Sequence, residues 1–409
     1  MKVFRSFLWL IVVLLALQVI RVFFSRQGSI AAFQFVLILG CFQFLLVQGA
    51  VFVWLASWAF RKYTHSRRPV RHALLSLGFC GVLLECLLAW WMYHPGRLPY
   101  PLRAPYGYYY DYFQEDLLQF DKRYAVYDRD LFYTLKPDDV FTFENIEFKN
   151  AYRTNRVGFR DTVRSSPQVV CIGDSYTMGW GVEQEEAFPS KLAELSGLGV
   201  ANMGMASYGT ARELMSLGKV DTSHLQWLII QYCGNDQGEN KSCIEHQYKL
   251  PISSQSDYEG LIHAAEVSHI YFPGKYLLII GSFFEKGLLN RIYPLFNLRW
   301  ERKDWGQGQE QQAKNFLDIL YHSPINFRKV KVIVTMMDDP QNMQGTFLRT
   351  VRKVSEEAPY REKFGGELKV VDMAPLLSKD DLFVLDVHFK ASGHMKIARA
   401  LLSAMHAAL

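Results

Sequence analysis

The chain has 409 residues with a formal net charge of +5, and 50% of its residues are hydrophobic. That length allows about two or three structural units. Basic residues do not gather in a dense stripe and no nucleic-acid-binding motif occurs, so the composition excludes a nucleic acid as partner. The hydrophobic share exceeds what a soluble core needs, and the surplus lies at the start of the chain.

Three long apolar runs follow one another there, at residues 7–24, 29–60 and 73–93. A helix rises about 1.5 Å per residue, so each run is long enough to cross about 30 Å of hydrocarbon. The sequence therefore predicts three transmembrane helices within residues 1–95, and buried core helices are the alternative. Glu85 lies inside the third run, where a carboxylate facing lipid is costly, so we expect it to face another helix.

Basic residues set the expected orientation of these spans. They are concentrated in the loop between the second and third runs, whereas the first loop holds little beyond Arg26. Basic loops stay in the cytoplasm. We therefore expect a multi-pass protein of the bacterial cytoplasmic (inner) membrane, with the lipid bilayer as a partner, a cytoplasmic N-terminus and a periplasmic or extracytoplasmic main part. A cleaved signal peptide is the alternative for the first run, but no small-x-small site follows Phe24.

Residues 96–165 are expected to form an aromatic linker and a small β lead-in. Prolines and tyrosines crowd residues 94–113, which suits either the headgroup layer of a membrane or a linker without membrane contact. Alternating runs between Tyr124 and Arg160 indicate two or three short strands with turns.

Apolar strand-like runs alternate with helical stretches over residues 166–409. The expected strands are residues 169–172, 199–203, 227–232, 329–336 and 368–372, and the expected helices are residues 184–196, 209–218, 346–357 and 391–408. This alternation predicts an α/β fold with a doubly wound, mainly parallel five-stranded sheet. Ligands of such sheets bind beyond the carboxyl ends of the strands.

Residues 237–328 interrupt this rhythm and are predicted to form a helical insertion. An apolar and aromatic stretch at about residues 270–298 is broken by glycines and prolines. Two interpretations remain open, namely ordinary helices that cap the site, or a segment whose apolar face contacts the membrane surface. A fourth span is disfavoured because the glycines and prolines divide the stretch.

Four blocks of glycine and polar residues follow the strands: Gly173-Asp174-Ser175, Gly204, Gly234-Asn235-Asp236 and Asp386-Val387-His388. Because the carboxyl ends of parallel strands meet at one edge, we expect these groups to gather there. The blocks resemble those of the SGNH/GDSL hydrolase superfamily of serine esterases and acyltransferases, over about residues 150–409. TNRVGFRD (154–161) also resembles what precedes the first block in membrane-tethered bacterial members. The resemblance implies an SGNH-like hydrolase domain with a flavodoxin-like sheet.

The resemblance also implies a role for each residue of the blocks. Ser175 would be the nucleophile, His388 its general base, and Asp386 the acid that holds the imidazole. The N–H groups of Ser175 and Gly204 and the amide of Asn235 would form the oxyanion hole. The other residues of the blocks would support the loops: Gly173, Asp174, Gly234 and Asp236.

The last block departs from the family pattern. The family places two residues between the acid and the histidine, whereas only Val387 intervenes here and Leu385 occupies the usual place of the acid. In an extended segment residues i and i+2 point to the same side, which lets Asp386 reach the ring. Ser175 alone would be interpreted as a helix-cap serine, and His388 alone as a surface loop residue, so the prediction depends on their occurring together.

Other reactive side chains receive simpler interpretations. Cys233 and Cys243 flank the loop of the third block, and an oxidising compartment permits a disulfide between them, with free buried thiols as the alternative. The histidines show no ligand spacing, so no metal and no cofactor is expected. His394 is expected to be structural. Asp338 and Asp339 are expected in a solvated turn, with substrate contact as the alternative.

Together these features predict a membrane-anchored, extracytoplasmic serine ester hydrolase, with O-acetyl esters of cell-envelope glycans as the favoured substrate. One alternative is an O-acyltransferase that modifies an exported polysaccharide and needs a separate acyl-donor membrane partner. Another alternative is a non-catalytic glycan-binding or scaffold protein of the envelope. The sequence leaves the acyl group and the alcohol of the substrate open.

Overall fold

The computed structural model describes residues 67–92, 94, 117–145, 147–161, 166–271, 274–292, 308–366, 368–384 and 386–407. The chain divides into two compact units, residues 1–115 with 260–300, and residues 116–259 with 301–409. The expected spans at residues 7–24 and 29–60 lie outside the described residues. Among the described helices, none combines the length and the apolarity that a membrane crossing requires.

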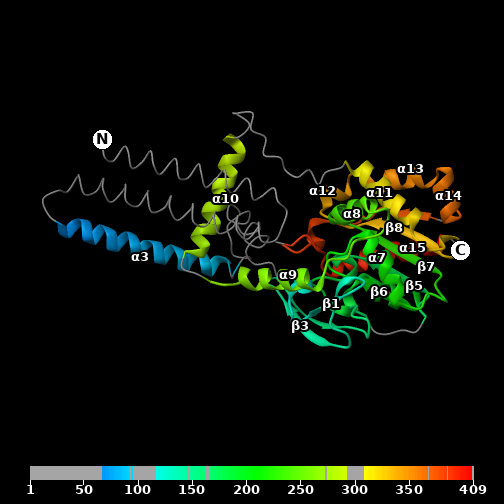
Figure 1. Ribbon diagram of the computed structural model, residues 1–409, viewed down its shortest axis with the longest axis horizontal. Helices are drawn as coiled ribbons and strands as arrows, with labels where there is room; N and C mark the ends of the chain where they lie inside the picture. Colours follow the sequence, from blue (N-terminus) through cyan, green and yellow to red (C-terminus); the bar gives the residue numbers. More distant parts are fainter. Residues whose placement is uncertain are drawn as a thin grey trace. The chain divides into compact units, whose positions relative to one another are not determined.

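The first unit contains α3 (Arg67–Met92), α10 (Lys275–Ile292) and the end of α9 (Gln255–Ser268), with α3 blue in Figure 1. The buried carboxylate of Glu85 on α3 accepts the backbone N–H groups of Tyr276, at 3.1 Å, and of Leu277, at 2.9 Å. The first N–H groups of a helix have no partner within it. Glu85 therefore caps α10, and the expectation that it faces another helix is confirmed.

A five-stranded parallel sheet forms the centre of the second unit (Figure 1). Its strands are β5 (Val169–Gly173), β6 (Val200–Gly204), β7 (Trp227–Tyr232), β8 (Lys331–Met336) and β9 (Leu368–Val371). They lie in the order β6-β5-β7-β8-β9, and every neighbouring pair is parallel. Each expected strand is confirmed. Continuous apolar runs suit such strands, because helices cover both faces of the sheet.

One face of the sheet is covered by α6 (Phe188–Ser196) and α15 (Ala391–His406). Their apolar residues share one core with the strands, which includes Leu192, Ile229 and Leu401. The other face carries α7 (Thr210–Ser216), α8 (Gln237–Glu245), α11 (Gln309–His322) and α13 (Phe347–Ser355). There Tyr232 stacks on Phe347 with 3.9 Å between ring centroids. Helices on both faces of a parallel sheet define a doubly wound α/β fold.

Shorter elements complete the second unit. The short α-helices are α5 (Ser175–Met178), α12 (Pro340–Met343) and α14 (Ala358–Phe364). Single 3-10 turns span Leu118–Phe120, Gln184–Glu186, Leu217–Lys219, Gly234–Asp236, Phe327–Lys329 and Lys379–Asp381. Of the described residues within 237–328, most lie in α8, α9, α10 and α11, which agrees with the helical character predicted there. Contact of residues 270–298 with a membrane stays a prediction.

The order of the strands reverses between β5 and β7. The chain passes from β5 to β6 on one side and then returns to β7 on the other side. In doubly wound sheets, the crevice at the carboxyl ends of two such strands is where ligands bind. Ser175 directly follows the loop residue Asp174 after β5, and Asn235 lies in the loop after β7. The sheet order therefore places both predicted residues at this crevice.

Two antiparallel hairpins precede the sheet in the chain. They consist of β1 (Ala125–Asp128) with β2 (Phe132–Leu135), and of β3 (Val140–Glu144) with β4 (Lys149–Arg153). The sequence predicted two or three strands, and the described chain has four. Asp128 accepts the N–H of Leu131 at 2.8 Å, and Asn145 accepts that of Phe148 at 3.1 Å. These side-chain turns divide each run into two strands.

A buried arginine joins the second hairpin to the chain that follows α5. Arg160 is 1% exposed, and its guanidinium donates to the carbonyls of Gly179 at 2.5 Å, Val182 at 2.7 Å and Ala151 at 3.1 Å. It also lies 3.6 Å from the centroid of the Tyr152 ring. Arg160 belongs to the stretch TNRVGFRD, so this stretch connects the lead-in to the chain that follows α5.

Replacing Arg160 by lysine should destabilise the protein, because an ammonium group cannot bind three carbonyls in fixed directions. Each buried group left unpaired costs about 1–3 kcal/mol, so we expect the free energy of unfolding to fall by about 2–4 kcal/mol. Chemical denaturation measures this change. Arg153→Lys is the matched control, because the ion pair of Arg153 with Glu185 is exposed and should be worth at most about 1 kcal/mol. Equal stability of Arg160→Lys and the wild type would contradict this role.

Candidate active site

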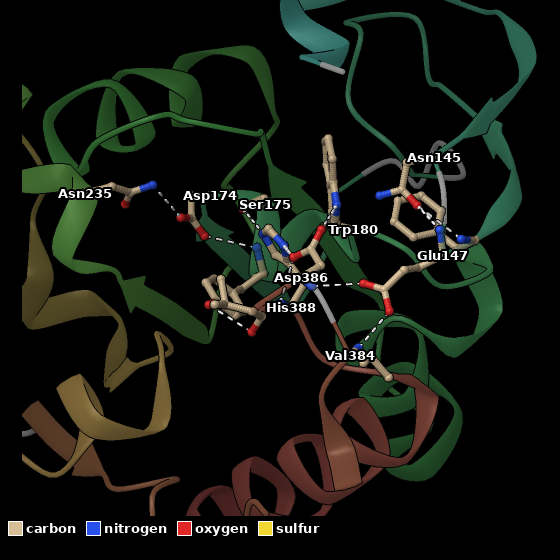
Figure 2. Close-up of polar contacts among 12 residues, drawn as sticks. Asn145, Glu147, Asp174, Ser175, Trp180, Asn235, Val384, Asp386 and His388 are labelled. Carbon is tan, nitrogen blue, oxygen red and sulfur yellow. Dashed lines mark hydrogen bonds and ion pairs between the residues drawn. The ribbon is translucent and has the colours of Figure 1, made fainter. Parts of the chain in front are cut away.

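Three side chains from two distant parts of the chain meet at the crevice. Ser175 begins α5, and its Oγ lies 2.6 Å from Nε2 of His388. Nδ1 of His388 is hydrogen-bonded to Oδ1 of Asp386. Figure 2 shows these contacts running from Ser175 through His388 to Asp386. The structure thus brings together the residues predicted as nucleophile, base and acid.

Little water reaches this group of side chains. Ser175 is 8% exposed, and the side chains of His388 and Asp386 are 17% and 9% exposed. Burial alone would raise the pKa of Asp386, but the charge of His388 and hydrogen bonds from His388 and Trp180 hold this pKa below its ordinary value. Asp386 therefore stays ionised, and its attraction to the imidazole is weakly screened.

The short spacing between acid and histidine is accommodated by a local turn. Oδ1 of Asp386 accepts the backbone N–H of His388 at 3.0 Å as well as the ring N–H. A carboxylate that binds the N–H two residues further on forms an Asx turn. The N–H of Phe383 also donates to the carbonyl of His388, at 3.1 Å, and closes the loop. The departure from the family spacing therefore does not separate acid and ring.

Two aromatic residues that sequence reasoning missed hold this pair. Nε1 of Trp180 donates to Oδ2 of Asp386 at 3.0 Å, and its ring stacks on His388 with 5.5 Å between centroids. The Tyr176 hydroxyl donates to the carbonyl of Val387 at 3.2 Å, and its ring centroid lies 4.7 Å from that of His388. Both residues lie in GDSYTMGWG. Their closeness to Ser175 was the signal in the sequence, but their partners are more than two hundred residues away.

Asp174 links the loops that follow β5 and β7. It is fully buried, Oδ1 accepts the N–H of Tyr176 at 3.0 Å, and Oδ2 accepts the amide of Asn235 at 3.3 Å. Its own N–H donates to Oε1 of Gln231 at 3.1 Å. Burial raises the pKa of Asp174 despite these hydrogen bonds. Asp174 has the contacts of a loop support, as predicted, and it orients Asn235.

Gly204 does not have the predicted role of oxyanion donor. Its N–H donates to Oδ1 of Asn202 at 3.0 Å and is therefore occupied. A Cβ at Gly204 would lie 2.2 Å from the backbone nitrogen of Met178, so the glycine allows β6 to approach α5. Gly173 serves a similar purpose, because a Cβ there would lie 2.2 Å from Oγ1 of Thr177. Close packing explains both glycines.

Two buried carboxylates hold the loop after β7. The N–H of Gly234 donates to Oδ2 of Asp338 at 2.9 Å, and Asn342 donates to the other oxygen at 3.0 Å. Asp338 is 8% exposed, so the predicted solvated turn is wrong for this residue. The residue is buried because its carboxylate accepts the N–H at the end of the neighbouring strand. Asp236 is buried and accepts the Thr210 hydroxyl at 2.9 Å. Gly234 and Asp236 thus both lie in loop-supporting contacts.

Cys233 and Cys243 are free thiols, so the disulfide considered from the sequence is not formed. Cys233 belongs to the core on the α6 and α15 side of the sheet. Cys243 lies on α8, which packs against α7 and α11 on the other side. Burial raises the pKa of both thiols. The alternative of free, buried thiols therefore holds.

His394 is buried, and its Nδ1 accepts the N–H of Phe188 at 3.2 Å. Burial, followed by the positive charges of Arg160 and His388, lowers its pKa to about 3. His394 is therefore neutral and structural, as expected. In the part of the chain that the structure describes, no group of three His, Cys, Asp or Glu side chains is arranged to hold a metal ion.

A buried carboxyl group lies on α7 behind the loops. Glu213 is fully buried, and neither of its oxygens has a hydrogen-bond partner among the described residues. Burial and the nearby charges of Asp236 and Asp174 raise its pKa well above the ordinary value. The fold therefore favours the protonated form of Glu213.

Replacing Glu213 by glutamine should flatten the pH dependence of stability. The unfolded chain releases this proton near pH 4.3, whereas the folded state retains it. The folded state then binds more protons than the unfolded state, so stability falls as the pH rises above about 5. We expect Glu213→Gln to lose less melting temperature than the wild type between about pH 5 and about pH 8.

Glu245→Gln is the matched control, because Glu245 lies on the neighbouring α8 with an exposed carboxylate. This variant should keep the wild-type loss of melting temperature over the same interval. If Glu213→Gln also kept it, Glu213 would carry no pH-linked cost.

Comparisons with known proteins complete the description of the site. No protein-family model matches the chain, and no curated protein matches it. One similar solved structure is that of a protein described as lipolytic and of the G-D-S-L family, from Desulfitobacterium hafniense DCB-2. It has 17% sequence identity and a TM-score of 0.27, and the match covers 57% of this chain and 98% of that chain.

A second similar structure is a carbohydrate esterase family 2 enzyme with a carbohydrate binding domain, from Corynascus thermopiles (Myceliophthora fergusii). It has 15% identity and a TM-score of 0.31, and the match covers 60% of this chain and 68% of that chain.

Proposed function

We propose that the chain is a serine ester hydrolase of the SGNH/GDSL type. The observation that carries the proposal is the 2.6 Å contact between Ser175 Oγ and His388 Nε2, continued by the hydrogen bond from His388 Nδ1 to Asp386. A serine hydroxyl becomes a nucleophile only beside a base. In a glycan-binding or scaffold protein, a serine at the start of a helix would only cap that helix. Such a serine requires no histidine beside its hydroxyl.

The geometry supports a role for each of these residues in ester hydrolysis. Ser175 Oγ attacks the ester carbonyl carbon while Nε2 of His388 takes its proton, and Asp386 stabilises the imidazolium. The tetrahedral intermediate then breaks its bond to the alcohol, and His388 gives the proton to the leaving oxygen. His388 next takes a proton from a water molecule, whose oxygen attacks the acyl carbon on Ser175. The bond from this carbon to Ser175 Oγ then breaks, His388 returns the proton to Oγ, and the acid is released.

The negative oxygen of the intermediate needs N–H donors. The N–H of Ser175 has no acceptor among the described residues. One amide hydrogen of Asn235 goes to Asp174, which leaves the second for the substrate. We assign the third donor to Ser207, in the turn after β6, in place of Gly204. Ser207 has a left-handed φ of 61°, and the described part of the chain offers its N–H no acceptor.

Turnover of p-nitrophenyl acetate by the full chain in detergent tests the hydrolase directly. We expect Ser175→Ala to lower kcat/KM by at least about 10³-fold, because the nucleophile is lost. Ser223→Ala is the matched control: Ser223 is exposed and its Oγ lies 3.1 Å from Nδ1 of His224, yet it lies outside the crevice. Equal rates for Ser175→Ala and the wild type would remove the hydrolase proposal.

The proposed substrate class is an acyl ester, such as an O-acetyl group, on a glycan of the cell envelope. The extracytoplasmic placement expected from the apolar runs supports this choice. Adding candidate glycan acceptors to the same assay separates the two reactions of such a site. Glycan acylation in excess of hydrolysis would assign an O-acyltransferase with an acyl-donor membrane partner.

We also propose that the chain is anchored in the bacterial cytoplasmic membrane with the catalytic unit outside. The apolar runs at residues 7–24, 29–60 and 73–93 and the basic loop before the third support this. Large apolar side chains are also exposed on α3: Phe79, Val82, Leu83, Leu84, Leu87 and Trp90. Alkaline phosphatase fused after Leu409 should be active, because it folds only outside the cytoplasm. A fusion active only as a cytoplasmic reporter would contradict the topology.

A further inference from the structure

We propose that Glu147 is a positioning residue that fixes the loop of Asp386, so that the β3–β4 hairpin is part of the active site. The proposal rests on the hydrolase function proposed above. Glu147 lies in the turn of that hairpin, 239 residues before Asp386 in the chain. Nothing in the sequence motifs connects the two.

A single carboxylate binds two N–H groups of the acid loop, which is the segment between Phe383 and His388 that carries Asp386. Oε1 of Glu147 accepts the N–H of Val384 at 2.7 Å, and Oε2 accepts the N–H of Asp386 at 2.9 Å. Figure 2 shows Glu147 reaching these two groups on the side of Asp386 that faces away from His388. Hydrogen bonds to an ionised acceptor are stronger than neutral ones. Asp386 is therefore held at its backbone by Glu147 and at its carboxylate by Trp180 and His388.

The turn of the hairpin presents Glu147 in a fixed position. Oδ1 of Asn145 accepts the N–H of Glu147 at 2.8 Å, and the N–H of Asn145 donates to the carbonyl of Phe148 at 3.0 Å. The turn therefore holds the backbone of Glu147 through its own hydrogen bonds, separately from the contacts of the Glu147 side chain. Such preorganisation is what a residue needs in order to hold a catalytic group in place.

Aromatic packing strengthens the same contact. Phe148, next to Glu147, lies against Phe383 with 5.5 Å between ring centroids, and Phe383 precedes Val384. Phe143 of β3 lies edge-on to Trp180 at 4.9 Å between centroids. The hairpin therefore touches both the acid loop and the indole that binds Asp386.

The hydrogen bonds of the loop show why it needs support from another segment. The loop closes on itself through the hydrogen bond from the Phe383 N–H to the His388 carbonyl. The N–H groups of Val384 and Asp386 lie within this closed loop and have no acceptor other than Glu147 in the described part of the chain. Without Glu147, Asp386 would have to keep its position through side-chain contacts alone.

Steady-state kinetics of the full chain tests this role. A fluorophosphonate, reacted to completion, counts the active sites, and kcat is expressed per active site. A displacement of about 1 Å costs about 10²-fold in rate, so we expect Glu147→Ala to lower kcat by about 10- to 100-fold with KM changed less than about threefold. Glu147→Gln keeps one acceptor oxygen, so its kcat should lie between that of the wild type and that of Glu147→Ala. This variant also carries the test if the alanine variant does not fold. Glu144→Ala is the matched control, because Glu144 lies in the same hairpin and its ion pair with Lys149 is exposed.

A double variant separates positioning from general stabilisation of the fold. If Glu147 acts through Asp386, then Glu147→Ala should change kcat by less than about twofold in an Asp386→Asn background. An equal loss of kcat in both backgrounds would overturn the proposal. So would a folded Glu147→Ala variant with wild-type kcat per titrated site.

A spectroscopic readout keeps this proposal distinct from the hydrolase proposal. The proton between His388 Nδ1 and Asp386 should give a low-field ¹H resonance in the wild type and in Ser175→Ala. We expect Glu147→Ala to shift or abolish it and Glu144→Ala to retain it. An unchanged resonance in Glu147→Ala would overturn the positioning role. A wild type that turns over no faster than Ser175→Ala would reject the hydrolase function. If Glu147→Ala still lost the resonance that the wild type shows, the positioning role would stand.

Discussion

The contact between Ser175 Oγ and His388 Nε2 joins two residues 213 positions apart in the chain. Each residue alone is ordinary, since one begins a short helix and the other lies in a loop before α15. The parallel sheet makes them neighbours. Ser175 follows the carboxyl end of β5, and the loop before α15, which carries His388, lies at the same edge of the sheet. The proposed chemistry depends on that meeting point.

Buried polar contacts hold the catalytic side chains in position, and most of these contacts join segments that are distant in the chain. Gln231 on β7 binds the N–H of Asp174, and Trp180 binds the carboxylate of Asp386. Arg160 and Glu147 extend this support to the hairpin that precedes the sheet. Because an unpaired group in such a place is costly, the hairpin and the sheet are expected to behave as one structure around the site.

The strands and their parallel arrangement could be predicted from the sequence, because apolar runs and their alternation with helical stretches are local signals. The motif blocks were likewise sufficient to predict that Ser175, His388 and Asp386 come together. The sequence failed where a motif does not reveal which group a residue binds. Gly204 matched a motif, but the side chain of Asn202, two residues earlier on the same strand, occupies its N–H. Asp338 was predicted to be solvated, yet it binds the N–H of Gly234. Glu147 could not be found, because only the folded hairpin brings it to Asp386.

The most direct measurement is the mass-spectrometric mapping of a fluorophosphonate adduct on the folded full-length chain. Such a probe phosphonylates a serine hydroxyl only where a base activates it. The account predicts one adduct, on the peptide that contains Ser175, and its disappearance in His388→Ala. An adduct on a different serine, or equal labelling of Ser175 without His388, would contradict it.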